Sequence, residues 1–111
     1  MKKKASSTLS QMVKIIVKET SPEKIILFGS QATRKVSPNS DIDLLIVESE
    51  PFGPTRSRRR EMTRIWKALV HFALPKDILV YSHDEVEYWQ SSVNHIIGRA
   101  LREGRILYER S

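Results

Sequence analysis

Apolar residues recur along the chain at two spacings, one typical of amphipathic helices and the other of buried strands. The first helical pattern precedes the Ser21-Pro22 step, which is expected to end that helix. The predicted helices lie at about 7–20, 62–69, 82–90 and 93–103, with a short helix after 29–30; the predicted strands lie at 24–28, 42–47 and 77–81, with 105–109 as a short strand or a docked end. This alternation predicts an α/β fold.

Three local signals refine this prediction. Ser82 followed by Glu85 is the sequence pattern of a capping box at the start of a helix. Gly104 follows the last predicted helix, where glycine is a favourable C′ residue. Trp66 lies on the apolar face of its helix and is therefore expected to lie in the core.

Length and composition restrict the class of protein. With 111 residues, the chain is expected to form one domain, residues 1–111, around a single modest core. No apolar stretch approaches the ~18 residues of a membrane-spanning helix, and the basic start lacks the apolar region of a signal peptide. The absence of cysteine excludes disulfides and cysteine-ligated zinc and fits the cytoplasm. The net charge of +6 favours anionic partners.

Two carboxylates open an apolar run, DIDLLIV, that should be a buried strand. Asp41 and Asp43 are two residues apart, so their side chains should share a face at a spacing of ~7 Å. Asp77 begins the next predicted strand and adds a third carboxylate. Three carboxylates at neighbouring strand ends suit Mg²⁺ or Mn²⁺ and could form a two-metal site for displacement at phosphorus. The alternative is structural, with Asp41 capping a turn and Asp43 facing solvent.

A glycine-serine turn precedes these acids and suggests a phosphate site. Gly29 and Ser30 follow an apolar strand and precede a predicted helix, whose first N–H groups favour an anion. Glycine permits close backbone approach, and a serine hydroxyl can donate to a phosphate oxygen. Alone, this dipeptide is weak evidence, because many strand-to-helix turns use it. Its combination with SDID points to a phosphate cradle beside a metal clamp.

The stretches GSQAT and SDIDLLIV resemble the GSxA(R/T)G…SDxDxxV motif of the nucleotidyltransferase superfamily that includes DNA polymerase beta. The short chain is similar as a whole to the minimal nucleotidyltransferase (MNT) domain, which implies that fold, with a single small mixed sheet flanked by helices. The resemblance implies catalytic and metal-binding roles for three acids and nucleotide-binding roles for four other residues. These residues are Asp41, Asp43 and Asp77, with Asp77 helping to take the proton, and Gly29, Ser30, Arg34 and Ser40.

One position departs from that motif. Arg34 stands where the family usually has a glycine. If the glycine is needed for a positive φ, Arg34 strains the turn; alternatively, Arg34 adds a donor toward phosphate. The departure bears on the efficiency of catalysis more than on the fold.

The resemblance also implies an activity and a partner. MNT proteins pair with helical HEPN proteins as antitoxin and toxin. The expected activity is transfer of AMP from ATP, with two Mg²⁺ ions, to a tyrosine hydroxyl of a HEPN ribonuclease, within a hetero-oligomer. Since no acceptor domain follows Ser111 in the sequence, a separate partner is expected to present the hydroxyl. The alternatives are a non-catalytic antitoxin that acts by occlusion and a small-molecule nucleotidyltransferase, against which the missing substrate domain argues.

A basic segment, Arg56–Arg60, lies near the start of a predicted helix, where the helix dipole disfavours cations. The cost in stability favours a role in binding a partner or the triphosphate, and a solvated helix end is the structural alternative. No aromatic residues interleave these arginines, which weighs against direct binding of nucleic acid. The three histidines lack the spacing of metal ligands and are interpreted as structural or surface residues.

Overall fold

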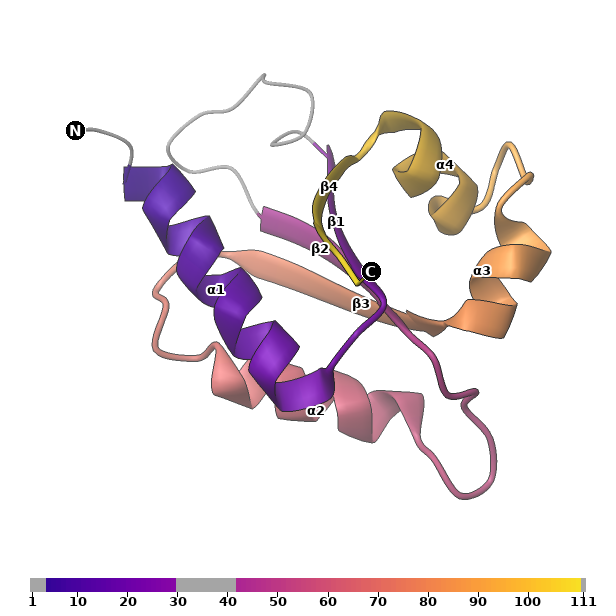
Figure 1. Ribbon diagram of the computed structural model, residues 1–111, viewed down its shortest axis with the longest axis horizontal. Coiled ribbons are helices and arrows are strands. Elements are labelled where there is room, and N and C mark those ends of the chain that lie inside the picture. Colours follow the sequence, from indigo (N-terminus) through magenta and orange to yellow (C-terminus); the bar gives the residue numbers. More distant parts are fainter. Residues whose placement is uncertain (1–3, 30–41, 111) are drawn as a thin grey trace.

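The computed structural model describes residues 4–29 and 42–110, whose helices and strands follow one another in the order that the sequence predicts (Figure 1). The elements are α1 (Lys4–Thr20), β1 (Lys24–Phe28), β2 (Ile42–Glu48), α2 (Arg58–Ala68), β3 (Lys76–Ser82), α3 (His83–Trp89), α4 (Ile96–Glu103) and β4 (Arg105–Glu109). The expected elements among the described residues are therefore confirmed, with differences of a few residues at their ends. The short helix expected after 29–30 lies outside the described residues.

The described strands form one mixed sheet in the order β3-β2-β1-β4, which confirms the predicted fold class. β1 is antiparallel to both of its neighbours, whereas β2 and β3 are parallel and are connected through α2. A parallel pair requires such a crossover, because a tight hairpin can join only antiparallel strands. The register aligns Asp43 of β2 with Phe28 on one side and with Asp77 on the other.

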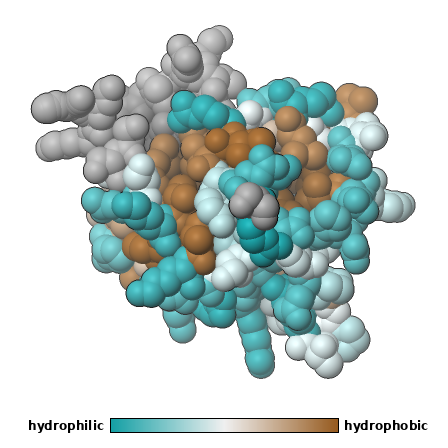
Figure 2. All heavy atoms as spheres, viewed as in Figure 1, coloured by the Kyte–Doolittle hydropathy of each residue, from teal (hydrophilic) through white to brown (hydrophobic). Residues whose placement is uncertain are grey.

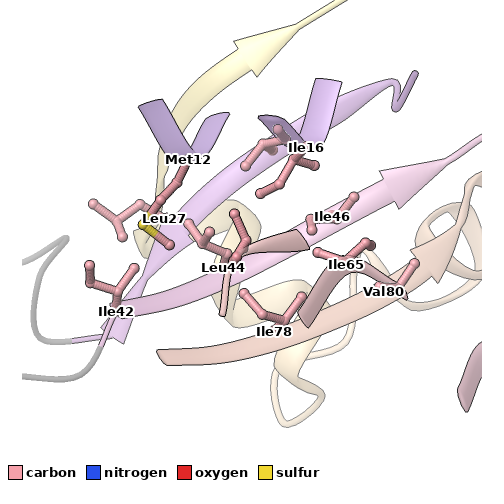
Figure 3. Close-up of a cluster of buried hydrophobic side chains, with 11 residues drawn as sticks. Met12, Ile16, Leu27, Ile42, Leu44, Ile46, Ile65, Ile78 and Val80 are labelled. Atoms are coloured by element: carbon pink, nitrogen blue, oxygen red, sulfur yellow. The ribbon is translucent and has the colours of Figure 1, made fainter. Parts of the chain in front are cut away.

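The larger apolar core lies between the sheet and the two helices α1 and α2 (Figure 3). Strand residues alternate between faces, so every second position of β2 and β3 contributes to this core. Its buried members are Met12, Ile16, Ile25, Leu27, Ile42, Leu44, Ile46, Ile65, Leu69, Ile78 and Val80. Burial of these side chains on one face attaches both helices to the sheet.

The opposite face of the sheet carries a smaller core. Ile26, Leu45, Val47 and Ala100 are its buried members, and partly buried residues of α3 and α4 pack against them. Asp43 precedes Leu45 by two positions and is therefore directed to this second face. Its register partner on β3 shares that direction, so both carboxylates lie at the end of the face covered by the smaller pair of helices.

The position of Trp66 differs from the prediction. Its side chain is 48% exposed, so the expectation of a core residue is wrong. Ile65 of α2 and Leu69, the C-cap residue one helical turn later, both have zero exposure. Trp66 is rotated by about 100° from Ile65 around the helix, which moves it off the buried stripe and toward the edge of β3.

Gly104 follows α4 as predicted, but its backbone conformation is not left-handed. Its φ is −83° and its ψ is 175°, values that any residue can adopt. The requirement is steric instead: a Cβ at this position would lie 2.5 Å from the carbonyl oxygen of Ala100 and 2.6 Å from Cγ2 of Ile26. Glycine therefore permits the end of α4 to contact β1 directly.

The surface carries both hydrophilic and hydrophobic side chains. On the face shown in Figure 2, hydrophilic residues border a hydrophobic area that extends from α1 toward α4. Within residues 4–29 and 42–110, no helix has both the length and the apolar character needed to cross a membrane.

Candidate active site

The turn after β1 brings the backbone into contact with a carboxylate. Gly29 has a φ of +75°, a conformation that side chains other than glycine rarely adopt. A Cβ built on Gly29 would overlap Oδ2 of Asp43 and lie 3.2 Å from its Cγ. Two independent constraints, the positive φ and the proximity of this carboxylate, therefore require glycine at the point where the chain leaves the sheet.

The parallel pairing of β2 and β3 places a second carboxylate beside the first. Asp43 and Asp77 are direct register partners, and neighbouring strands are about 4.8 Å apart. Asp43 is half-buried, and Asp77, on the edge strand, is exposed. The two side chains therefore combine a sheltered carboxylate next to the Gly29 turn with an accessible one at the sheet edge.

Four of the predicted site residues lie outside the described residues: Ser30, Arg34, Ser40 and Asp41. Within the described ranges, no three histidine, aspartate or glutamate side chains are grouped closely enough to hold a metal ion. Asp43 and Asp77 nevertheless supply oxygen donors only, the chemistry that Mg²⁺ and Mn²⁺ prefer. The donor set fits a hard divalent cation. Asp41 is the other member of the predicted set of three carboxylates.

The basic segment Arg56–Arg60 is partly engaged in internal ion pairs. Arg56 bonds to the buried carboxylate of Glu48. Arg58 is bonded to Glu85 through both terminal nitrogens, one of them 2.9 Å from Oε1. This bond holds the pKa of Glu85 below its ordinary value. Two of the arginines thus attach α2 and its preceding loop to the rest of the fold.

Arg59 and Arg60 differ from their neighbours in this segment. Both are exposed, and the described part of the chain contains no ion pair of either residue. The N-cap of α2 is Ser57, so both lie in the first turn of the helix, as the sequence suggests. These two side chains are the portion of the basic segment that is open to a partner.

The buried acid Glu48, at the far end of β2, was not identified from the sequence. Glu48 is only 3% exposed. Burial is the main cause that raises the pKa of its carboxyl to about 7; the neighbouring Glu61 raises this pKa further, and Arg56 opposes both effects. Within the described residues, its Oε2 has no hydrogen-bond partner. The signal was available: Glu48 shares the strand period of Ile46, which predicts a position facing the larger core.

Two histidines have structural contacts. His95 caps α4 by accepting a hydrogen bond from the N–H of Ile97 at 3.1 Å, and its ring stacks on Trp89 at a centroid distance of 4.2 Å. His83 lies 2.9 Å from Glu23 at the surface, and this bond raises the pKa of the imidazole. Both histidines lie at the starts of helices, His83 in α3 and His95 before α4, and not on the strands that carry Asp43 and Asp77.

The sequence matches a family model for most of its length. The model of the family described as Polymerase beta, Nucleotidyltransferase matches residues 10–111. The chain therefore belongs to this nucleotidyltransferase family, as the resemblance of its motifs implies. A comparison with curated proteins gives no match.

Solved structures share the fold. A toxin-antitoxin structure with AMP-PNP has 17% identity and a TM-score of 0.55, over 92% of this chain and 73% of that one. A candidate nucleotidyltransferase from Sulfolobus solfataricus has 20% identity and a TM-score of 0.56, over 99% and 91%. A mutant of the toxin-antitoxin pair MntA-HpeT has 15% identity and a TM-score of 0.56, over 92% and 73%. At these identities the likeness is one of fold.

Proposed function

We propose that this chain is an antitoxin that transfers AMP from ATP to a tyrosine hydroxyl of a HEPN-type toxin and thereby silences it. The observation that carries the proposal is the alignment of Asp43 with Asp77 beside the Gly29 turn, in a chain of the nucleotidyltransferase family. The toxin-antitoxin structures of the same fold, one of them with AMP-PNP, support the choice of partner and nucleotide. The toxin and the chain would form a hetero-oligomer in the cytoplasm.

The proposed reaction is a displacement at the α-phosphorus of ATP. The acceptor oxygen forms a bond to this phosphorus, the bond to the bridging oxygen of the β-phosphate breaks, and pyrophosphate leaves. Asp77 takes the proton of the attacking hydroxyl, a role that suits an exposed carboxylate at the sheet edge. The backbone at Gly29 and the hydroxyl of Ser30 hold the triphosphate, with Arg34 and Ser40 as further contacts.

Asp43 and the predicted Asp41 and Asp77 are the proposed ligands of two Mg²⁺ ions. When bound, such ions neutralise charge that develops on the transferring phosphoryl group. The aligned carboxylates offer oxygen donors from two neighbouring strands, which suits a hard divalent cation at this end of the sheet. The aspartates replaced by glutamate in the MntA-HpeT mutant are two positions apart, the spacing of Asp41 and Asp43 here.

The test is a mass measurement of the partner after incubation with the chain, ATP and Mg²⁺. Wild type should add one or more AMP units to the toxin. Asp43→Asn should lower the rate by roughly a thousandfold, the effect of losing several kcal/mol of transition-state stabilisation. Asp84→Asn is the matched control, because Asp84 is an exposed aspartate in the first turn of α3, and it should leave the rate within about twofold.

Two results would contradict the proposal. Toxin inhibition without added mass, which needs no ATP and persists in Asp43→Asn, would indicate an antitoxin that acts by occlusion. AMP transfer to small hydroxylated molecules, with none to the toxin, would indicate a small-molecule nucleotidyltransferase. Removal of the chain after the reaction distinguishes occlusion from covalent modification. A covalently modified toxin stays inactive, whereas an occluded toxin recovers its activity.

A further inference from the structure

The outer edge of β3 is covered unevenly by side chains of the same protein. Nη1 of Arg58 donates to the carbonyl oxygen of Val80 at 2.9 Å, and the N–H of Ser82 donates to Oε1 of Glu85 at 2.9 Å. Both bonds cover the second half of the strand. In the described part of the chain, no side chain bonds to the backbone of residues 76–78. In the half of this edge strand that carries Asp77, the outer backbone groups are therefore not bonded to side chains, which is what pairing with another chain requires; Asp77 is exposed there, whereas Ile78 is 4% exposed.

A pocket adjoins this open half on the side of α2. Its volume is about 280 Å³, and its lining residues are Met62, Thr63, Trp66, Lys76, Asp77 and Ile78. Nζ of Lys76 donates to the carbonyl oxygens of Phe72 at 2.8 Å and Leu74 at 3.1 Å. The ammonium group is bonded to these carbonyls and also lies 5.9 Å from the centroid of the Trp66 ring, so one part of the indole is next to a cation. The rest of the half-exposed indole, with Met62 and Ile78, offers apolar surface to a ligand side chain.

Asp77 borders the pocket, yet strand alternation directs its side chain to the face opposite that of Ile78. Ile78 belongs to the core on the α2 side, whereas Asp77 is directed to the opposite face with its register partner Asp43. A strand added to this edge has the same alternation, so consecutive residues of that strand point to opposite faces. A residue aligned with Asp77 would therefore approach the carboxylates while its immediate neighbour enters the pocket.

We propose that the substrate protein presents its tyrosine on an extended segment that pairs with residues 76–78 of β3, with a large apolar residue directly before or after the tyrosine seated against Trp66. This proposal rests on the proposed transfer reaction for its choice of tyrosine. Backbone hydrogen bonds supply affinity in such strand addition, and side-chain pockets supply specificity. Trp66 is here a residue for substrate specificity, and Asp77 receives the proton.

The first test measures binding without catalysis. Trp66 and Trp89 are the two tryptophans of the chain, so a Trp89→Phe variant leaves Trp66 as its single indole reporter. The probes are synthetic peptides with a central tyrosine flanked by leucine, the same peptide with glycine as both flanks, and a version with methylated backbone nitrogens. The leucine peptide should change the emission of Trp66 and protect the outward-facing amides of Lys76 and Ile78 from hydrogen exchange. The glycine and methylated peptides should bind at least about tenfold more weakly.

The second test measures transfer of AMP to the same peptides with ATP and Mg²⁺. Trp66→Ala should raise KM about tenfold, leave kcat within about twofold and remove the preference for leucine over glycine. Trp89→Ala is the matched control, since this indole is 37% exposed on α3 and outside the pocket, and it should change neither constant by more than about twofold.

The outcomes distinguish this inference from the reaction on which it rests. Peptide binding at Trp66 without AMP transfer supports the docking edge and contradicts the transfer reaction. Transfer that is indifferent to Trp66→Ala, to the flanking residues and to backbone methylation supports the reaction and overturns the docking edge. Absence of both binding and transfer overturns both.

Discussion

The two ends of β2 hold acidic residues in opposite circumstances. At one end, Asp43 lies against the backbone of Gly29 and is aligned with the exposed Asp77. At the other end, Glu48 is buried, bonded to Arg56, and has a raised pKa. The same strand thus has an open acidic end and a closed one.

This difference shows how a short strand can serve both chemistry and folding. At the closed end, the fold supplies Arg56 as an internal cation, yet burial still dominates the titration of Glu48. At the open end, the exposed Asp77 can exchange a proton or a ligand with its surroundings. We therefore connect the closed end with the pH dependence of stability and the open end with the proposed reaction.

The largest effect on stability is expected at the closed end. Glu48 has a folded-state pKa of about 7 against an ordinary value of 4.5, so the folded protein binds more protons than the unfolded chain between these values. Its contribution to stability is complete below pH 4.5 and is lost as the pH rises through 7. Glu48→Gln should therefore stabilise the protein by on the order of 3 kcal/mol at pH 8 and have little effect at pH 4.5. Urea unfolding at both pH values measures this difference.

Glu50→Gln is the matched control for that measurement. Glu50 also contacts Arg56, with 3.3 Å between Oε1 and Nε, but its side chain is 79% exposed. Solvent screening should limit its effect to less than about 0.5 kcal/mol at either pH. An equal gain in stability for Glu48→Gln at both pH values would show that the buried charge is not the cause.

A smaller loss of stability is expected at the open end. Gly29→Ala should destabilise the protein by about 1–3 kcal/mol, because alanine is strained at φ +75° and its Cβ overlaps the carboxylate of Asp43. The displaced carboxylate should also reduce AMP transfer by more than the loss of folded protein explains. Gly53→Ala is the control: no atom lies within 4 Å of the added Cβ, and we expect less than about 0.5 kcal/mol. Equal effects of the two variants would contradict the steric role of Gly29.

The smallest effect on stability is expected in the basic segment, which follows the closed end of β2 in the sequence. Replacing both Arg59 and Arg60 with glutamine should change the free energy of unfolding by less than about 0.5 kcal/mol, since both residues are exposed. It should slow the modification of an acidic partner at low salt without reducing its final extent. Arg58→Gln, which breaks the bonds to Glu85, should lower the midpoint of urea unfolding instead. A rate that does not depend on Arg59 and Arg60 at any salt concentration would exclude them from the encounter surface.

The sequence was sufficient for the order of the described elements, and for their type except at 105–109, which it left as a strand or a docked end and which forms β4. The capping box of Ser82 and Glu85 is present as predicted. Burial was harder to predict at helix margins and strand ends. Trp66 satisfies the helical spacing of the apolar stripe, yet the stripe is narrower than the spacing implies and its centre passes through Ile65.

The motif in the sequence was sufficient to predict which residues form the site. The geometry of the site depends on the pairing of strands, which no local sequence pattern determines. The alignment of Asp43 with Asp77 follows from the parallel register of β2 and β3, which is a tertiary property. The ion pairs of Arg56 and Arg58 likewise depend on residues brought close by the fold. The roles of Ser30, Arg34, Ser40 and Asp41 stay predictions, because these residues lie outside the described ranges.

The strand order has a consequence for the time course of folding. β1, near the beginning of the sequence, pairs with β4, so that Lys24 is aligned with Glu109. Closing this long loop costs chain entropy before the contacts that reward it can form, which slows folding. During synthesis, one edge of β1 must wait for β4 to leave the ribosome. Until then, the apolar run of β1 lacks its second neighbouring strand, which exposes it to aggregation in the nascent chain.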